Sequence, residues 1–200
     1  MKLNTKIILP ILLISTLLIL LVGCLPGLTP PVTPPEVGGS YGGGIVAYIL
    51  QSGDPGYISG QTHGLVAATT DQNGGATIAW SNITNTLVGT TGTAIGTGQT
   101  NTIAIVGQGG CTSGAAYLCD HLAEGGYNDW YLPSKDELNK LYLNQVAIGG
   151  FAGYNYWSSS EASASRAWGQ YVGSGGQGGY TIRTTAFASG RLGLFNHLSI

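Results

Sequence analysis

The stretch from Gly125 to Tyr142 constrains the fold more than any other part of the chain, because it encodes a turn, an extended step and a helix start in succession. Pro133 cannot continue the preceding structure, and it keeps the residue before it out of the α region. Ser134 followed by Glu137 predicts a capping box, in which each side chain accepts a hydrogen bond from the other residue's backbone N–H. The sequence therefore predicts a helix over residues 134–145 and an architectural, non-catalytic role for this stretch.

Large aromatic residues crowd the second half of the chain, among many polar neighbours. A glycine-rich domain has few large aliphatic side chains for its core, so we expect Trp130, Trp157 and Trp168 to be buried, with Trp130 beneath the predicted helix. Exposed rings beside polar groups mark binding sites. We therefore assign Tyr154, Tyr156 and Arg166 to a candidate ligand site, with burial of the two tyrosines as the alternative.

Two motifs carry a resemblance to a known family. One is Trp130-Tyr131-Leu132-Pro133-Ser134 with Asp136-Glu137-Leu138, and the other is Tyr156-Trp157-Ser158-Ser159-Ser160-Glu161. They resemble the signatures of the Lcl C-terminal domain family, named after a bacterial collagen-like adhesin, and the similarity covers roughly Tyr41 to Val172. The resemblance implies an α+β, C-type-lectin-like fold similar to that of formylglycine-generating enzymes. Two helices would pack on small antiparallel sheets, with long irregular loops rich in glycine and threonine.

The chain also departs from what this resemblance implies. It has no collagen-type Gly-X-Y triplets, so a stalk-driven trimer is not expected, and the sequence indicates no oligomeric state. Residues 186–200 do not match the closing strand of the family. Asn128-Asp129-Trp130 contains the residues of the C-type-lectin calcium motif in a different order. We therefore expect no calcium-dependent sugar site.

The N-terminus has the pattern of a bacterial lipoprotein signal. Lys2 and Lys6 precede an apolar run over residues 7–22, and Leu21-Val22-Gly23-Cys24 is a lipobox. The run is shorter than the about 20 residues that span a bilayer, although an uncleaved membrane helix is the alternative. We expect a signal peptide over 1–23, lipid on Cys24, and a proline-rich tether over 24–37. Leu25 after the cysteine favours the outer membrane, on the periplasmic or the surface side.

The remaining residues, 38–200, are enough for one globular domain. Five basic and nine acidic residues follow Cys24, which gives the mature chain a net charge of 5 − 9 = −4. No basic cluster is present, so nucleic acid is not an expected partner, and the polyanion binding of the adhesin relative is not expected either. Cys111 and Cys119 remain in an exported chain, which favours a disulfide between them over two free thiols.

Periodicity and turn residues predict the order of the secondary-structure elements. Residues 81–98 have weak periodicity and predict an exposed irregular excursion. The expected helices span 99–106, 113–124 and 134–145. The expected strands span 41–51, 64–70, 77–80, 154–157, 168–172 and 180–184, with a glycine-rich hairpin turn over 173–179.

The chain lacks a recognisable catalytic set. Its three histidines lie in unrelated contexts, and Ser158-Ser159-Ser160 has no nucleophile-elbow glycines. We expect no metal and no cofactor, because no ligand spacing or phosphate-binding loop is present. The leading hypothesis is a non-enzymatic, membrane-anchored recognition or adhesion domain that binds a glycan or another cell-surface ligand. The alternatives are a structural envelope lipoprotein without a ligand and a hydrolase that uses Asp129 or Glu161.

Overall fold

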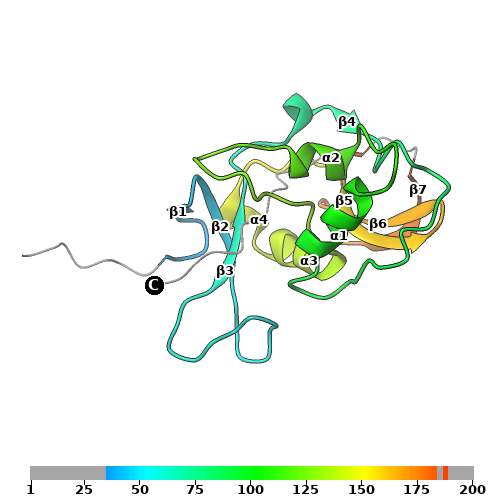
Figure 1. The fold of residues 1–200 in the computed structure, drawn as a ribbon. Helices are drawn as coiled ribbons and strands as arrows, with labels where there is room; N and C mark the ends of the chain where they lie inside the picture. The colour runs from blue at the N-terminus through cyan, green and yellow to red at the C-terminus, as the bar shows by residue number, and fades with distance from the viewer. Residues whose placement is uncertain (1–34, 184–186, 189–200) are drawn as a thin grey trace, which may run out of the picture. The chain divides into compact units, whose positions relative to one another are not determined.

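The computed structural model of the chain describes residues 35–183 and 187–188, which all belong to one compact unit, Pro34–Ile200. The predicted signal peptide, Cys24 and most of the tether lie outside the described residues, as does most of 186–200. In the described part, four α-helices and two small sheets form an α+β domain (Figure 1). The coarse fold class predicted from the sequence is therefore confirmed.

The first sheet is antiparallel and has the order β1-β2-β3. Its strands are β1 (Ser40–Tyr41), β2 (Gly44–Ile49) and β3 (Gly64–Ala67). β2 and β3 contribute Val46, Leu65 and Val66 to the core, all fully buried. β2 ends at Ile49, earlier than predicted, because residues 50–63 leave the sheet as a long loop, which Leu50 N closes by donating to His63 O at 2.8 Å (Figure 1). β3 begins at Gly64 as predicted and ends at Ala67, earlier than the predicted residue 70.

The second sheet has the order β4-β8-β5-β6-β7, and its neighbours are antiparallel except for the parallel pair β5 and β8. Its strands are β4 (Thr77–Ile78), β5 (Asn155–Ser163), β6 (Arg166–Tyr171), β7 (Gln177–Ile182) and β8 (Phe187–Ala188). The glycine-rich turn predicted over 173–179 is shorter in the structure, because β7 begins at Gln177 and continues the ladder with β6.

The helices are α1 (Gly98–Val106), α2 (Ala115–Asp120), α3 (Lys135–Leu143) and α4 (Gln145–Ile148). α1 matches its prediction closely, whereas α2 is shorter than the predicted 113–124. The helix predicted over 134–145 ends earlier, because Asn144 leaves helical geometry between α3 and α4. The Asn144 side chain donates instead to Ala47 O at 2.9 Å and ties this break to β2.

The predicted capping box at the start of α3 is confirmed. Ser134 Oγ accepts from Glu137 N at 3.3 Å, and Glu137 Oε2 accepts from Ser134 N at 2.7 Å. α3 contacts β2 in the first sheet and β5 and β6 in the second. This capped helix therefore joins the two sheets into one core.

Trp130 and Trp157 are both buried, as predicted, whereas Trp168 is only partly buried. Trp157 lies in the main core and donates from Nε1 to Ile78 O at 3.0 Å. Trp130, however, packs with Val66 and Ala68 of the β3 region in a separate small cluster. The expectation that it lies beneath the capped helix is wrong, because the extended step after Trp130 carries the chain from the first sheet to α3.

The turn that opens the 125–142 stretch depends on a close backbone crossing. Gly43 and Gly125 both have positive φ, 76° and 62°, and a Cβ on either would lie 2.2 Å from the Cα of the other. Only glycine permits this approach without displacement of the backbone. The crossing fixes the residue 127–131 segment against the first sheet.

Candidate functional site

The residues predicted to bind a ligand do not form one site. Tyr154 is 55% exposed, but Tyr156 is fully buried. The Tyr156 hydroxyl accepts from Ala152 N at 2.7 Å and donates to Asp71 Oδ2 at 3.0 Å. The assignment of Tyr156 as a ligand platform is therefore wrong, because β5 turns this side chain into the core.

Arg166 is exposed, but it lies far from Tyr154 along the β5–β6 hairpin. Arg166 pairs with Ser163 at one end of the ladder, and Asn155 pairs with Tyr171 at the other. β6 runs from Arg166 at one end to Tyr171 at the other, so at about 3.3 Å per residue the two ends are about 17 Å apart. One small ligand cannot touch both residues.

The predicted disulfide is not formed, and both cysteines are free thiols. Cys119 is fully buried on the inner face of α2, within the main core. Cys111 is half-buried, and its Sγ lies 3.6 Å from Ser81 Oγ. Burial raises the pKa of the Cys119 thiol far above its usual range, so this residue is an apolar packing group.

Glu161, one of the two carboxylates considered for hydrolysis, is part of a buried structural network. Its side chain is 6% exposed and pairs with Arg183, whose side chain is 0% exposed. Glu161 also accepts from Val88 N at 2.8 Å and Gly89 N at 2.9 Å. The Arg183 guanidinium lies 4.2 Å from the centre of the Trp80 ring. These contacts anchor the irregular 81–98 excursion.

Asp129 lies at a cleft that the fold assembles from three segments. We name it the Asp129 cleft; its volume is about 180 Å³. It is lined by Gln99, Thr102 and Ile103 of α1, by Asp120 at the end of α2, and by Asn128, Asp129, Trp130 and Tyr131. Two carboxylates, two amides and two aromatic residues thus meet at one small hollow.

The walls of the Asp129 cleft are fixed by hydrogen bonds. Leu132 N donates to Thr102 Oγ1 at 3.0 Å, and Thr102 Oγ1 donates to Gly98 O at 2.8 Å. Trp130 Nε1 donates to Glu124 O at 3.3 Å. These bonds join the 130–132 step to α1, so the cleft is held open by the fold itself.

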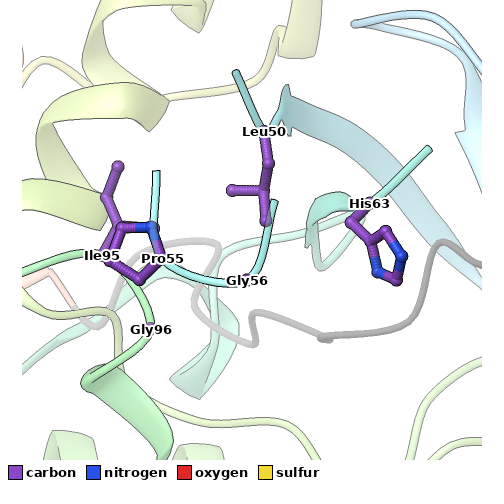
Figure 2. A pocket seen from close by; sticks show the side chains of 6 residues that line it. All are labelled: Leu50, Pro55, Gly56, His63, Ile95 and Gly96. Carbon is purple, nitrogen blue, oxygen red and sulfur yellow. The ribbon is translucent and has the colours of Figure 1, made fainter. Parts of the chain in front are cut away.

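A second cleft, the His63 cleft, lies where the loop over residues 50–63 meets the loop that precedes α1. It has a volume of about 290 Å³ and is lined by Leu50, Pro55, Gly56, His63, Ile95 and Gly96. Figure 2 shows Leu50 between Pro55 and Ile95 on one side and His63 on the other. His63 Nε2 lies 2.8 Å from Gln61 Oε1. Among its lining residues only His63 has a polar side chain, so this cleft offers fewer polar side chains than the Asp129 cleft.

Glu137 lies buried between the two clefts and contacts a wall of each. Its carboxylate accepts from Gly96 N at 2.8 Å, and the Tyr131 hydroxyl lies 3.5 Å from the same oxygen. Burial raises the pKa of Glu137, although the backbone donors of Ser134, Gly96 and Gly98 oppose that rise. The capping glutamate thus positions the loop over 93–98 as well as α3.

Sequence reasoning singled out only part of this site. The sequence predicts Asp129 only as a possible hydrolytic group and Asn128-Asp129-Trp130 only as a reordered calcium motif. Gln99, Asp120 and His63 have no predicted site role. The available signal was the polar pair at 128 and 129 directly before a buried aromatic step. α1 and α2 reach this pair only through tertiary folding.

No protein-family model matches the chain, and no curated protein is similar enough to match it. Within the described residues, no group of three or more histidine, cysteine, aspartate or glutamate side chains could hold a metal ion. No helix in this described part is both long and apolar enough to cross a membrane.

Proposed function

We propose that the chain is a membrane-anchored envelope lipoprotein whose globular domain recognises a glycan without catalysing a reaction, and that the glycan binds in the Asp129 cleft. The lining of this cleft carries the proposal. Gln99 and Asn128 can each donate and accept hydrogen bonds, and Asp120 and Asp129 accept them. Sugar hydroxyls need both kinds of partner.

The apolar part of the lining supports the same proposal. Ile103, Trp130 and Tyr131 border the cleft, and a sugar ring presents C–H groups that pack on such surfaces. The cleft is also fixed before a ligand arrives, through the bonds from Thr102 and Trp130. A preformed site loses less conformational entropy on binding.

The resemblance to the Lcl C-terminal domain family and the C-type-lectin-like fold form part of this proposal, since that family is named after an adhesin. The lipobox at Cys24 supports the anchoring step, and Leu25 supports an outer-membrane location. A Cys24→Ala variant should accumulate as an unlipidated precursor. Detection of the wild-type chain as a soluble, unacylated protein would contradict the anchoring step.

The binding step is tested with the full chain in detergent on a panel of bacterial and host glycans. Gln99→Ala and Asn128→Ala should each weaken binding about threefold to tenfold, the effect of one lost hydrogen bond. His63→Ala and Tyr154→Ala are matched controls and should leave the affinity unchanged. Loss of binding only with His63→Ala would move the site to the His63 cleft. A chain that binds no glycan would favour the structural lipoprotein.

One observation favours a hydrolase as the second candidate. Asp120 and Asp129 line the same cavity, and glycosidases use two facing carboxylates. Incubation of the bound glycan with the full chain, followed by mass analysis, tests this. If the wild-type chain yields cleavage products and Asp129→Asn yields none, the function is hydrolysis and not recognition alone.

A further inference from the structure

The charges around the Asp129 cleft are unbalanced. Asp120 and Asp129 both line it, and no lysine or arginine of the described residues does so. The four described lysines and arginines are all engaged or placed elsewhere. Lys135 lies over Trp168 and Lys140 over Tyr48, Arg183 pairs with Glu161, and Arg166 lies at the turn of the β5–β6 hairpin.

His121 directly follows Asp120 in the chain, and its ring is held in place by Asp120 and Tyr117. Its Nδ1 lies 3.4 Å from Asp120 Oδ2 and 3.0 Å from Tyr117 O, and its ring stacks on Tyr117 at 3.9 Å. Asp129 has no ion-pair partner within 4.0 Å among the described residues.

The negative charges also act on Tyr131, which forms part of the wall of the cleft. Burial raises the pKa of the Tyr131 phenol, and the charges of Glu137 and Asp129 raise it further. Tyr131 is buried, so the field that it experiences is only weakly screened by solvent. A ligand in the cleft lies beside the same Asp129 carboxylate.

We propose that the Asp129 cleft is selective for glycans that carry a free amino group, such as de-N-acetylated amino sugars. This inference rests on the proposed function and names the substrate class of the same site. The ammonium of such a sugar has three donors and one positive charge, which match Asp129 and Asp120. Its hydroxyl groups match Gln99 and Asn128, and its ring packs on Ile103.

The selectivity is measured with three oligosaccharides of equal length: a glucosamine oligomer, its N-acetylated form and a uronic acid oligomer. The full chain in detergent should bind the glucosamine oligomer about tenfold or more tightly than the acetylated form, because hydrogen bonds to charged groups are the stronger ones. The uronic acid oligomer should bind more weakly than either. The preference should shrink as ionic strength rises.

Asp129→Asn keeps the shape of the side chain and removes its charge, so it should abolish most of the preference. Asp136→Asn removes an aspartate charge from α3, away from the cleft, and should leave the preference intact. Asp120→Asn serves as a second charge variant if Asp129→Asn does not fold, which its melting temperature reports. Equal affinity of the wild-type chain for the charged and acetylated oligomers would overturn the inference and leave the proposed function standing.

Ethanolamine separates the two proposals, since it offers an ammonium without a sugar. The wild-type chain could bind ethanolamine, lose this binding in Asp129→Asn, and bind no oligosaccharide. That result would support the charge selectivity and overturn the glycan function. Binding of neither would overturn both.

Discussion

Two buried glutamates anchor the same irregular excursion, and they do so by different chemistry. Glu161 binds Val88 N and Gly89 N and has a buried arginine, Arg183, as its counter-charge. Glu137 binds Gly96 N and Ser134 N, and no lysine or arginine pairs with it within the described residues.

The comparison shows two ways in which a fold stabilises a carboxylate removed from water. An ion pair supplies an opposite charge but places two desolvated ions in the core. Backbone donors supply partial charges at a helix start, without a second ion. Loss of one partner should therefore be more destabilising at Glu161 than at Glu137.

The largest expected effect comes from Arg183→Ala. It leaves Glu161 buried without its counter-charge, and the free energy of unfolding should fall by about 3–5 kcal/mol. Urea denaturation measures this change. The double variant Glu161→Gln/Arg183→Met removes both charges and should recover most of the loss. If Arg183→Ala is as stable as the wild type, the ion pair does not anchor the segment over residues 81–98.

Gly98→Ala tests the Glu137 side of the comparison. A Cβ at Gly98 would lie 2.3 Å from Glu137 Oε2 and 2.6 Å from the Tyr131 ring. Overpacking of this kind costs about 1–3 kcal/mol. Thermal unfolding should show a lower Tm. The affinity of the Asp129 cleft for its glycan should also fall, because Tyr131 forms part of the wall of the cleft. Gly109→Ala, where a Cβ meets nothing within 4 Å, is the matched control.

Ser134→Ala removes the hydroxyl half of the capping box. The cost should be about 0.5–2 kcal/mol, the usual range for an N-cap. Ser134 Oγ also donates to Ala94 O at 2.8 Å, so the loss should lie in the upper part of that range. Chemical denaturation with an unchanged m-value would assign the loss to stability. No measurable change would contradict the role of this cap.

The smallest expected effect is a pH dependence. The folded-state pKa of Glu137 is raised above the ordinary value of 4.5, so the folded state binds more protons than the unfolded state between these two values. The stabilising contribution of this protonation is full below the ordinary pKa and is lost as pH rises through the folded pKa. Urea titrations across this pH range should show that the free energy of unfolding falls as pH rises in the wild-type chain and does not fall in Glu137→Gln. Identical pH profiles would contradict the assignment to Glu137.

The capping box shows what local sequence determines. Ser134 and Glu137 are three residues apart, and their mutual bonds depend only on the start of a helix, so the residues themselves specify the contact. The burial of Trp130 and Trp157 follows from their hydrophobicity. Asn144 was not anticipated as the end of α3, because its partner Ala47 is 97 residues away.

The sequence by itself determined the mixed helix and strand content and the cap at Ser134, since these depend on neighbours within one or two turns of the chain. It also determined that Trp130 and Trp157 are buried, because large apolar rings are excluded from water. Tertiary structure alone decided that Tyr156 faces the core, that Cys111 and Cys119 stay apart as thiols, and that Arg183 neutralises Glu161. It also brought α1, the end of α2 and Asp129 together at one cleft. These contacts join segments up to tens of residues apart, and only packing of the complete core sets which side chains meet there.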